Sequence, residues 1–236
     1  MASPVAVLFS APMDVTHVEG AHSEATPGDP ERLTPESARR LEAWLSLPEG
    51  DGAELLGGRI VYKAMASIEH GDAVMGIAEQ LGRFRGPPGT PGGWWLSQEV
   101  DMYLAGHGVR PDMVGWRMDR HPMPPQKVNL TSYKHLGVYV TPPDWVCEVL
   151  STSTRSRDEE EGLKWQAYYE AGVGHYWLVD LFRQQITVYQ RGARDFEPVE
   201  ILGREGTKAL PPFEATDLVA KRVFLLADLL RQPGGG

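Results

Sequence analysis

The chain has 236 residues, of which 42% are apolar, enough for one sizeable core or at most two small domains. It contains no run of about 18 apolar residues, so we expect no membrane span; its single cysteine, Cys147, excludes an internal disulfide and a cysteine-based zinc cluster and fits a reducing cytoplasm. The net charge of −9 argues on its face against a nucleic-acid partner, but residues 1–36, with six acids and one base, supply −5 of it.

Proline, glycine and helix-capping residues predict where the first elements begin and end. Residues 1–33 are rich in Pro, Gly, Ala and acids and lack periodicity, so we expect a flexible tail. Thr34-Pro35 predicts an N-cap followed by proline at the first position of a short amphipathic helix. Gly57-Gly58 predicts a tight hairpin turn between AELL and RIVYKA. A longer helix is expected over about residues 68–84, where apolar residues recur along one side.

The middle of the chain reads as strands separated by loops. We expect strands over 94–105 and 109–116, joined by a tight turn at Gly106–Gly108. A long polar connection with five prolines follows over residues 117–143. This stretch overlaps a locally basic segment, 110–135, which carries five cations against two acids and gives weak support for a polyanionic substrate. A solvated loop with scattered charges explains the same composition equally well.

The most informative stretch is 142–180. It predicts a buried strand near Asp144–Leu150, a charged helix that begins near Ser156–Asp158 and ends at Ala171–Gly172, and a buried strand over 175–182. Further strands near 186–190 and 196–201 and a last helix over about 220–231 complete the pattern. The order of elements predicts a mixed α/β sheet flanked by helices in a single domain.

Three residues in this frame point to chemistry. Glu148 lies in the middle of an apolar strand, where an ionised carboxylate is costly unless a cation or several donors meet it. Asp112 stands near the start of the preceding strand, and Lys164 lies two turns into the following helix. Two acids on adjacent strands can hold one hard divalent cation such as Mg²⁺, which can polarise a phosphoryl oxygen, and a neighbouring lysine can neutralise growing charge.

The motifs around these residues resemble a known family. The chain has R-P-D at 110–112, P-x-W-V-x-E-V-L-S-x-S-T from Pro143, K-x-x-x-Y at Lys164–Tyr168, and A-G-V-x-x-Y-W-L-V-D from Ala171. These patterns resemble the Uma-type restriction endonucleases of the PD-(D/E)XK nuclease superfamily. The acid-Leu-Leu-Gly-Gly hairpin at Glu54–Gly58 and the helix that opens near His70 are similar too. The resemblance covers about residues 34–232.

The resemblance implies a restriction-endonuclease-like core and an enzyme that hydrolyses DNA phosphodiester bonds with Mg²⁺ or Mn²⁺. Asp112, Glu148 and the backbone carbonyl of Val149 would bind the metal, and Lys164 would assist the attacking water. Most of the superfamily has its lysine two residues after the strand acid, where this chain has Leu150. Within the family a lysine on the following helix replaces it, and Lys164 matches.

One departure from the family pattern concerns the acid that accompanies this lysine. The family usually has an aspartate four residues before it, whereas here Asp158 lies six residues before and Glu160 occupies the fourth position. Candidate accessory residues therefore include five side chains whose roles stay open: Glu54, Gln98, Ser151, Asp158 and Glu160.

Structural alternatives exist for each predicted site residue. Asp112 could cap its own turn, Glu148 could pair with an arginine, and Lys164 could form a solvated i,i+4 pair with Glu160. Glu54 could equally be a surface acid of its hairpin, and His70 reads as a helix-start residue rather than a ligand.

A competing function uses the same fold without cleavage. The chain could be an inactive nuclease-like domain that binds nucleic acid or a protein partner, as its acidic net charge and missing strand lysine suggest. For an active enzyme we expect a homodimer, since cutting both strands of DNA needs two sites.

Overall fold

The computed structural model describes residues 33–48, 51–63, 66–89, 91–130, 137–150 and 158–227, and only the backbone of residues 158–161. The predicted tail therefore lies outside the described residues, apart from Leu33, and its separation from a single domain over 34–232 stays a prediction. Within the described ranges, no helix is long and apolar enough to cross a membrane.

The first three helices begin and end close to where the sequence predicts. α1 (Pro35–Leu45) is capped by the Thr34 hydroxyl, which accepts a hydrogen bond from the Ser37 N–H. α2 (Ile68–Leu81) is capped in the same way by Ser67 and continues into the 3₁₀ turn η2 (Gly82–Phe84). α3 (Asp158–Ala171) ends at Gly172, whose φ of +87° is the left-handed conformation typical of a helix C-terminus.

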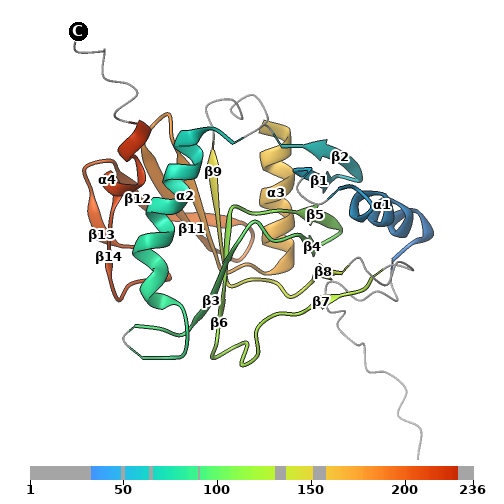
Figure 1. Ribbon diagram of the computed structural model, residues 1–236, viewed down its shortest axis with the longest axis horizontal. Helices are drawn as coiled ribbons and strands as arrows, with labels where there is room; N and C mark the ends of the chain where they lie inside the picture. Colours follow the sequence, from blue (N-terminus) through green and yellow to red (C-terminus); the bar gives the residue numbers. More distant parts are fainter. Residues whose placement is uncertain are drawn as a thin grey trace, which may run out of the picture.

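The central sheet has six strands in the order β12-β11-β10-β9-β6-β3 (Figure 1). Their bounds are β3 (Trp94–Gln98), β6 (Met113–Arg117), β9 (Trp145–Leu150), β10 (His175–Asp180), β11 (Gln185–Arg191) and β12 (Phe196–Gly203). β9 lies in the interior of the sheet, parallel to β10 and antiparallel to β6. The predicted mixed sheet with β9 as a buried strand is confirmed.

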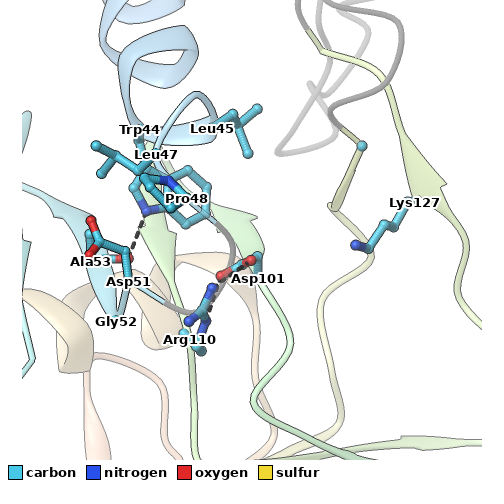
Figure 2. Close-up of a pocket in the computed structure, with 11 residues that line it drawn as sticks. Trp44, Leu45, Leu47, Pro48, Asp51, Gly52, Ala53, Asp101, Arg110 and Lys127 are labelled. Carbon is cyan, nitrogen blue, oxygen red and sulfur yellow. Dashed lines mark hydrogen bonds and ion pairs between the residues drawn. The ribbon is translucent and has the colours of Figure 1, made fainter. Parts of the chain in front are cut away.

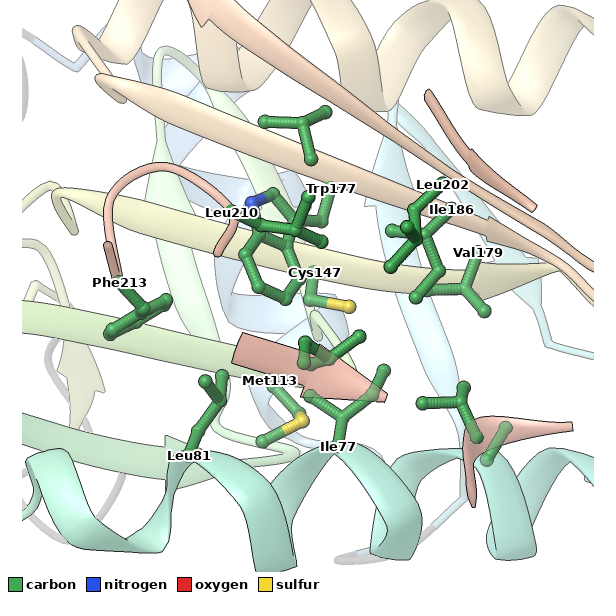
Figure 3. Close-up of a cluster of buried hydrophobic side chains, with 14 of the residues drawn as sticks. Ile77, Leu81, Met113, Cys147, Trp177, Val179, Ile186, Leu202, Leu210 and Phe213 are labelled. Carbon is green, nitrogen blue, oxygen red and sulfur yellow. The ribbon is translucent and has the colours of Figure 1, made fainter. Parts of the chain in front are cut away.

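The two faces of this sheet are covered by different helices, so successive residues of β9 meet different surroundings. Cys147 and Met113 pack toward Ile77 and Leu81 of α2 in the core shown in Figure 3. Val146 packs instead in the cluster that contains Tyr168 of α3. Because side chains alternate along a strand, Glu148 faces the α3 side, and Cys147 is a buried core residue that faces away from it, as predicted.

A second six-stranded sheet, in the order β2-β1-β5-β4-β8-β7, packs beside α1 and α3. Its strands are β1 (Ala53–Leu56), β2 (Arg59–Tyr62), β4 (Met102–Leu104), β5 (His107–Val109), β7 (Lys127–Val128) and β8 (Val138–Tyr139). Positive φ at both Gly57 and Gly58 confirms the predicted hairpin turn. Gly108 is also required, because a Cβ there would lie 2.7 Å from the Trp44 ring of α1.

Several sequence predictions differ from this structure, and one is the strand expected over 109–116, which is divided between β5 and β6. The strand expected over 94–105 is interrupted, because Glu99 has a φ of +46° that ends β3 and starts a separate β4–β5 hairpin in the second sheet. The turn of that hairpin is Ala105-Gly106. The connection over 117–143, expected to be a loop, contributes the short strands β7 and β8.

The C-terminal region also differs from expectation. The helix expected over 220–231 is broken, since α4 (Ala220–Val223) ends at a bend at Phe224 and residues 228–231 lie outside the described part. A two-stranded sheet of β13 (Thr207–Ala209) and β14 (Asp217–Val219), which the sequence reading missed, precedes α4.

Candidate active site

Asp112 and Glu148 face each other across two neighbouring strands. The antiparallel ladder pairs Met113 with Cys147, so Asp112, one residue before β6, stands across from Glu148 of β9. Residues opposite each other in an antiparallel pair project from the same face. Both acids are buried, Asp112 at 3% and Glu148 at 7% exposure. The two carboxylates predicted from their spacing therefore lie side by side on one face of the sheet.

Asp112 is held by three groups from three elements. Its Oδ2 accepts a hydrogen bond from the Val149 N–H at 2.7 Å, and its Oδ1 lies 3.3 Å from Lys63 Nζ and 3.4 Å from His70 Nε2. Burial by itself would raise the pKa of Asp112, but His70 and Lys63 outweigh it and hold the pKa well below its ordinary value. Asp112 therefore contacts groups from distant segments of the chain and does not only cap its own turn.

Val149 has a second connection to this acid. The N–H and C=O of one strand residue point to the same side of the strand, as in a hydrogen-bonded ladder pair. Since the Val149 N–H donates to Asp112, its carbonyl is directed to that side as well. This orientation agrees with the ligand role that the resemblance implies for the carbonyl.

Glu148 is met by two residues of α3. Its Oε1 lies 2.6 Å from Lys164 Nζ and accepts a hydrogen bond of 2.5 Å from the Tyr168 hydroxyl. Burial raises the pKa of Glu148; Lys164 opposes this shift, and the nearby Asp112 charge adds to it. The partner of Glu148 is thus a lysine, and not the arginine of the structural alternative.

Lys164 bridges two acids and not one. Its Nζ also lies 3.1 Å from Glu54 Oε1, and Glu54 is buried at 4% exposure. Burial would lower the pKa of Lys164, but Glu148 and Glu54 outweigh it and raise the pKa above its ordinary value. Lys164 is 8% exposed, so it is not a solvated surface lysine, and Glu54 is not a surface acid of its hairpin.

Sequence reasoning missed Lys63 altogether and assigned His70 only a place at a helix start. Lys63 follows β2, whose side chains are mostly exposed, and it meets Asp112 from 49 positions earlier in the chain. No spacing rule connects the two residues. For His70 a signal existed, because the helix that opens near His70 is part of the resemblance to the family, and His70 lies in its first turn.

Arg110 forms hydrogen bonds with both Glu54 and Lys63 through its backbone. Its guanidinium forms two hydrogen bonds to the Asp101 carboxylate, at 2.7 and 2.8 Å, next to a pocket of about 220 Å³ that Trp44 and Lys127 help to line (Figure 2). Its backbone N–H donates to Glu54 Oε1 at 2.8 Å, and its carbonyl accepts from Lys63 at 2.6 Å. Arg110, two residues before Asp112, therefore links Glu54 and Lys63, the two site residues of the first hairpin.

The other accessory candidates are only partly placed. Gln98 is exposed at the end of β3 and pairs with Met113, which puts its side chain on the α2 face of the sheet, away from Asp112. Ser151 lies outside the described residues. Asp158 and Glu160 begin α3, but their side chains are outside the described part, so the acid of the family pattern stays a prediction.

The basic segment 110–135 is less positive than its composition suggests. Its cations pair with acids as follows: Arg110 with Asp101, Arg117 with Asp119, and Arg120 with Asp144. Lys127 lies above the Tyr139 ring, and Lys134 lies outside the described residues. A count of charges therefore overstates the attraction of this segment for a polyanion.

The donor set is compatible with a hard divalent cation. Within the described ranges, no three His, Cys, Asp or Glu side chains are grouped closely enough to hold a metal ion by themselves. Mg²⁺ typically needs only one or two carboxylates and keeps waters at its other positions. Asp112 and Glu148 supply two such oxygen donors on one face, with the Val149 carbonyl directed to the same edge. The residues present fit such an ion.

A mixed sheet between α2 and α3, with paired acids on adjacent central strands and a lysine on the next helix, defines a restriction-endonuclease-like nuclease fold. Comparison with known proteins agrees. The chain belongs to the Uma2 family, described as "Putative restriction endonuclease", whose family model matches residues 36–220. The predicted resemblance is thereby confirmed.

A solved structure shares this fold. The crystal structure of a putative nuclease belonging to DUF820 from Anabaena variabilis is 20% identical in sequence and has a TM-score of 0.57. The match covers 79% of this chain and 98% of that one. No curated protein is significantly similar to the chain in sequence.

Proposed function

We propose that the protein is a metal-dependent endonuclease that hydrolyses DNA phosphodiester bonds. The observation that carries the proposal is the pair of buried carboxylates, Asp112 and Glu148, which face each other across β6 and β9 with Lys164 ion-paired to one of them. Membership of a nuclease family supports the reaction class, and DNA as substrate follows from the family description alone.

Each residue has a distinct role in this proposal. Asp112, Glu148 and the Val149 carbonyl would hold Mg²⁺ or Mn²⁺. Such an ion, when bound, polarises a phosphoryl oxygen and acidifies a coordinated water. Lys164 offsets the negative charge of Glu148 and Glu54, which lie 2.6 and 3.1 Å from its ammonium in a buried place. The Tyr168 hydroxyl fixes the orientation of the Glu148 carboxylate.

The test is nicking of supercoiled plasmid by the purified protein with Mg²⁺ or Mn²⁺. Glu148→Ala should abolish nicking, and Glu148→Gln, which keeps the acceptor for Tyr168, should reduce it at least about 100-fold if the charge is needed for the metal. Glu170→Ala removes an exposed acid of the same helix region and should leave the rate unchanged. Equal cleavage by the wild type and Glu148→Ala would identify a contaminating nuclease and remove the proposal.

A second candidate is a nuclease-like domain that has lost cleavage and binds nucleic acid or a protein. The observation in its favour is that protein groups already meet both acids: Lys63 and His70 at Asp112, and Lys164 at Glu148. Calorimetry with Mn²⁺ separates the two candidates. Binding at micromolar to millimolar concentration that Asp112→Asn abolishes supports the nuclease, and no binding supports the inactive domain.

We also propose a homodimer. β12 is an edge strand of the central sheet, and it exposes Val199 and Ile201. Phe182 is exposed as well. An unpaired edge with apolar side chains favours association with a second copy. Light scattering should give twice the mass of one chain, and a monomer at high concentration would contradict this.

A further inference from the structure

Two lysines approach the acids of the site, and their surroundings differ. The Lys164 side chain is 10% exposed, and its ammonium is shared between two buried carboxylates. The Lys63 side chain is 28% exposed, and its ammonium meets one carboxylate, that of Asp112, and the Arg110 carbonyl. Lys164 is therefore enclosed among acids, while Lys63 stands at the rim of the site, where solvent reaches it.

We propose that Lys63, and not Lys164, is the lysine that contacts the substrate phosphate, and that without metal it occupies the Asp112 oxygen that a metal ion would use. This inference rests on the proposed nuclease function and assigns a residue that the family pattern does not include. It divides the work of the two cations: Lys164 neutralises the acids and Lys63 binds the phosphate.

The surroundings of the two ammonium groups favour this division. An ammonium group has three N–H donors. Lys164 directs its contacts to Glu148 and Glu54 at 2.6 and 3.1 Å, and a buried lysine between two acids gains nothing by leaving them. Lys63 also has two acceptors, the Arg110 carbonyl at 2.6 Å and Asp112 at 3.3 Å, but only one of them is an acid, and its side chain is 28% exposed, so a phosphate can approach its ammonium from solvent.

The position of Lys63 also implies competition with a metal. Its ammonium would be repelled from Asp112 Oδ1 by a divalent cation at that oxygen, since like charges a few ångströms apart repel strongly in a poorly hydrated site. A lysine has a flexible four-carbon stem, so the ammonium can turn while Lys63 stays in place on the hairpin. A phosphate held beside Asp112 would lie within reach of it, and the charge that grows on its oxygens would be stabilised.

Lys63→Met tests the proposal, because it removes the charge and keeps most of the stem. Mn²⁺ binding measured by calorimetry should tighten about 3- to 10-fold as a competing cation is lost. The nicking rate at saturating Mn²⁺ should fall about 100-fold because phosphate stabilisation is lost. Lys63→Arg should recover part of the rate. Lys221→Met removes an exposed lysine of α4 and should change neither quantity.

The opposite signs of the two effects make the proposal refutable. Weaker Mn²⁺ binding in Lys63→Met would mean that Lys63 only positions Asp112, and an unchanged nicking rate would mean that it does not touch the phosphate. Either result overturns this inference while wild-type cleavage that depends on Glu148 leaves the nuclease proposal intact. A wild-type protein that neither binds Mn²⁺ nor nicks plasmid would overturn both.

Discussion

Replacement of Lys164 by methionine is the most direct test of how the acids are held. Met has an unbranched side chain of similar length, so the change removes the ammonium and little packing. It leaves Glu148 and Glu54, at 7% and 4% exposure, without the cation that lies 2.6 and 3.1 Å from them. Since a buried charge without a partner is costly, the folded state should lose stability.

The magnitude follows from measurements on other buried ion pairs. Breaking such a pair by removing one partner costs about 3–5 kcal/mol of unfolding free energy. For a chain of this size, 1 kcal/mol corresponds to about 2–4 °C in Tm, so the melting temperature should fall by about 6–20 °C. The Arg110 N–H still donates to Glu54, and the Tyr168 hydroxyl to Glu148, which favours the lower half of this range.

The assay is urea unfolding of the chelator-treated protein, with a double-mutant cycle. Glu148→Gln in the Lys164→Met background removes the stranded charge and keeps an acceptor for Tyr168. The double variant should therefore lose less than the sum of the single variants, with a coupling free energy of about 1–3 kcal/mol.

The stability of Lys164→Met should depend on pH in a direction that follows from the pKa of Glu148. Burial already raises the pKa of Glu148, and Lys164 opposes this rise. Removal of Lys164 should therefore raise the pKa of Glu148 further. A carboxyl whose folded pKa exceeds its unfolded value destabilises the fold at pH values above both, and this penalty falls as the pH drops through the folded pKa. The gap between wild type and Lys164→Met should thus narrow in mild acid. A loss of unfolding free energy below about 1 kcal/mol at neutral pH is typical of an exposed ion pair. Such a small loss would refute the interpretation that Lys164, Glu148 and Glu54 form a buried ionic group.

Two further predictions concern neighbours of the site and its scaffold. In the metal-free protein the pKa of His70, which burial lowers and Asp112 raises by a greater amount, should lie above its ordinary value; NMR titration should show it fall in Asp112→Asn, and an unchanged value would contradict the contact. Gly108→Ala should cost about 1–3 kcal/mol in thermal unfolding, since a Cβ there overlaps the Trp44 ring. Gly71→Ala, where a Cβ meets nothing within 4 Å in a helix, should instead stabilise by about 0.5–1 kcal/mol, and equal effects of the two changes would refute the packing argument.

Much of the central frame could be predicted because its signals are local. A single acid in an apolar strand marked Glu148, and Gly172 marked the end of α3, where its φ of +87° is indeed left-handed. The period of two along β9 was enough to place Cys147 away from the site. Each of these inferences depends only on residues a few positions apart, and a periodic strand or a helix end fixes them without knowledge of the rest of the chain.

The parts that could not be predicted depend on contacts between distant segments. Glu54 was predicted only as an accessory candidate, with a surface acid as an equal alternative, since nothing nearby in sequence shows that Lys164 approaches it. Lys63 lies 49 positions before Asp112 and reaches it only through the folded arrangement of the chain, which also brings it to the Arg110 carbonyl. The break at Glu99 was missed because a positive φ at a non-glycine residue has no signature in the apolar pattern. Long-range packing decides these three cases.

The acids and lysines of the site come from the first hairpin, the central sheet and α3, and this origin has a consequence for control of the protein. Glu54 and Lys63 belong to the first hairpin, Asp112 and Glu148 to the central sheet, and the backbone of Arg110 ties one group to the other. The proposed site is thus assembled where the two sheets meet and not within either one. Transient detachment of the hairpin, with the main sheet intact, would disconnect half of the polar network, so a ligand that wedges between the two sheets could silence the molecule without unfolding it.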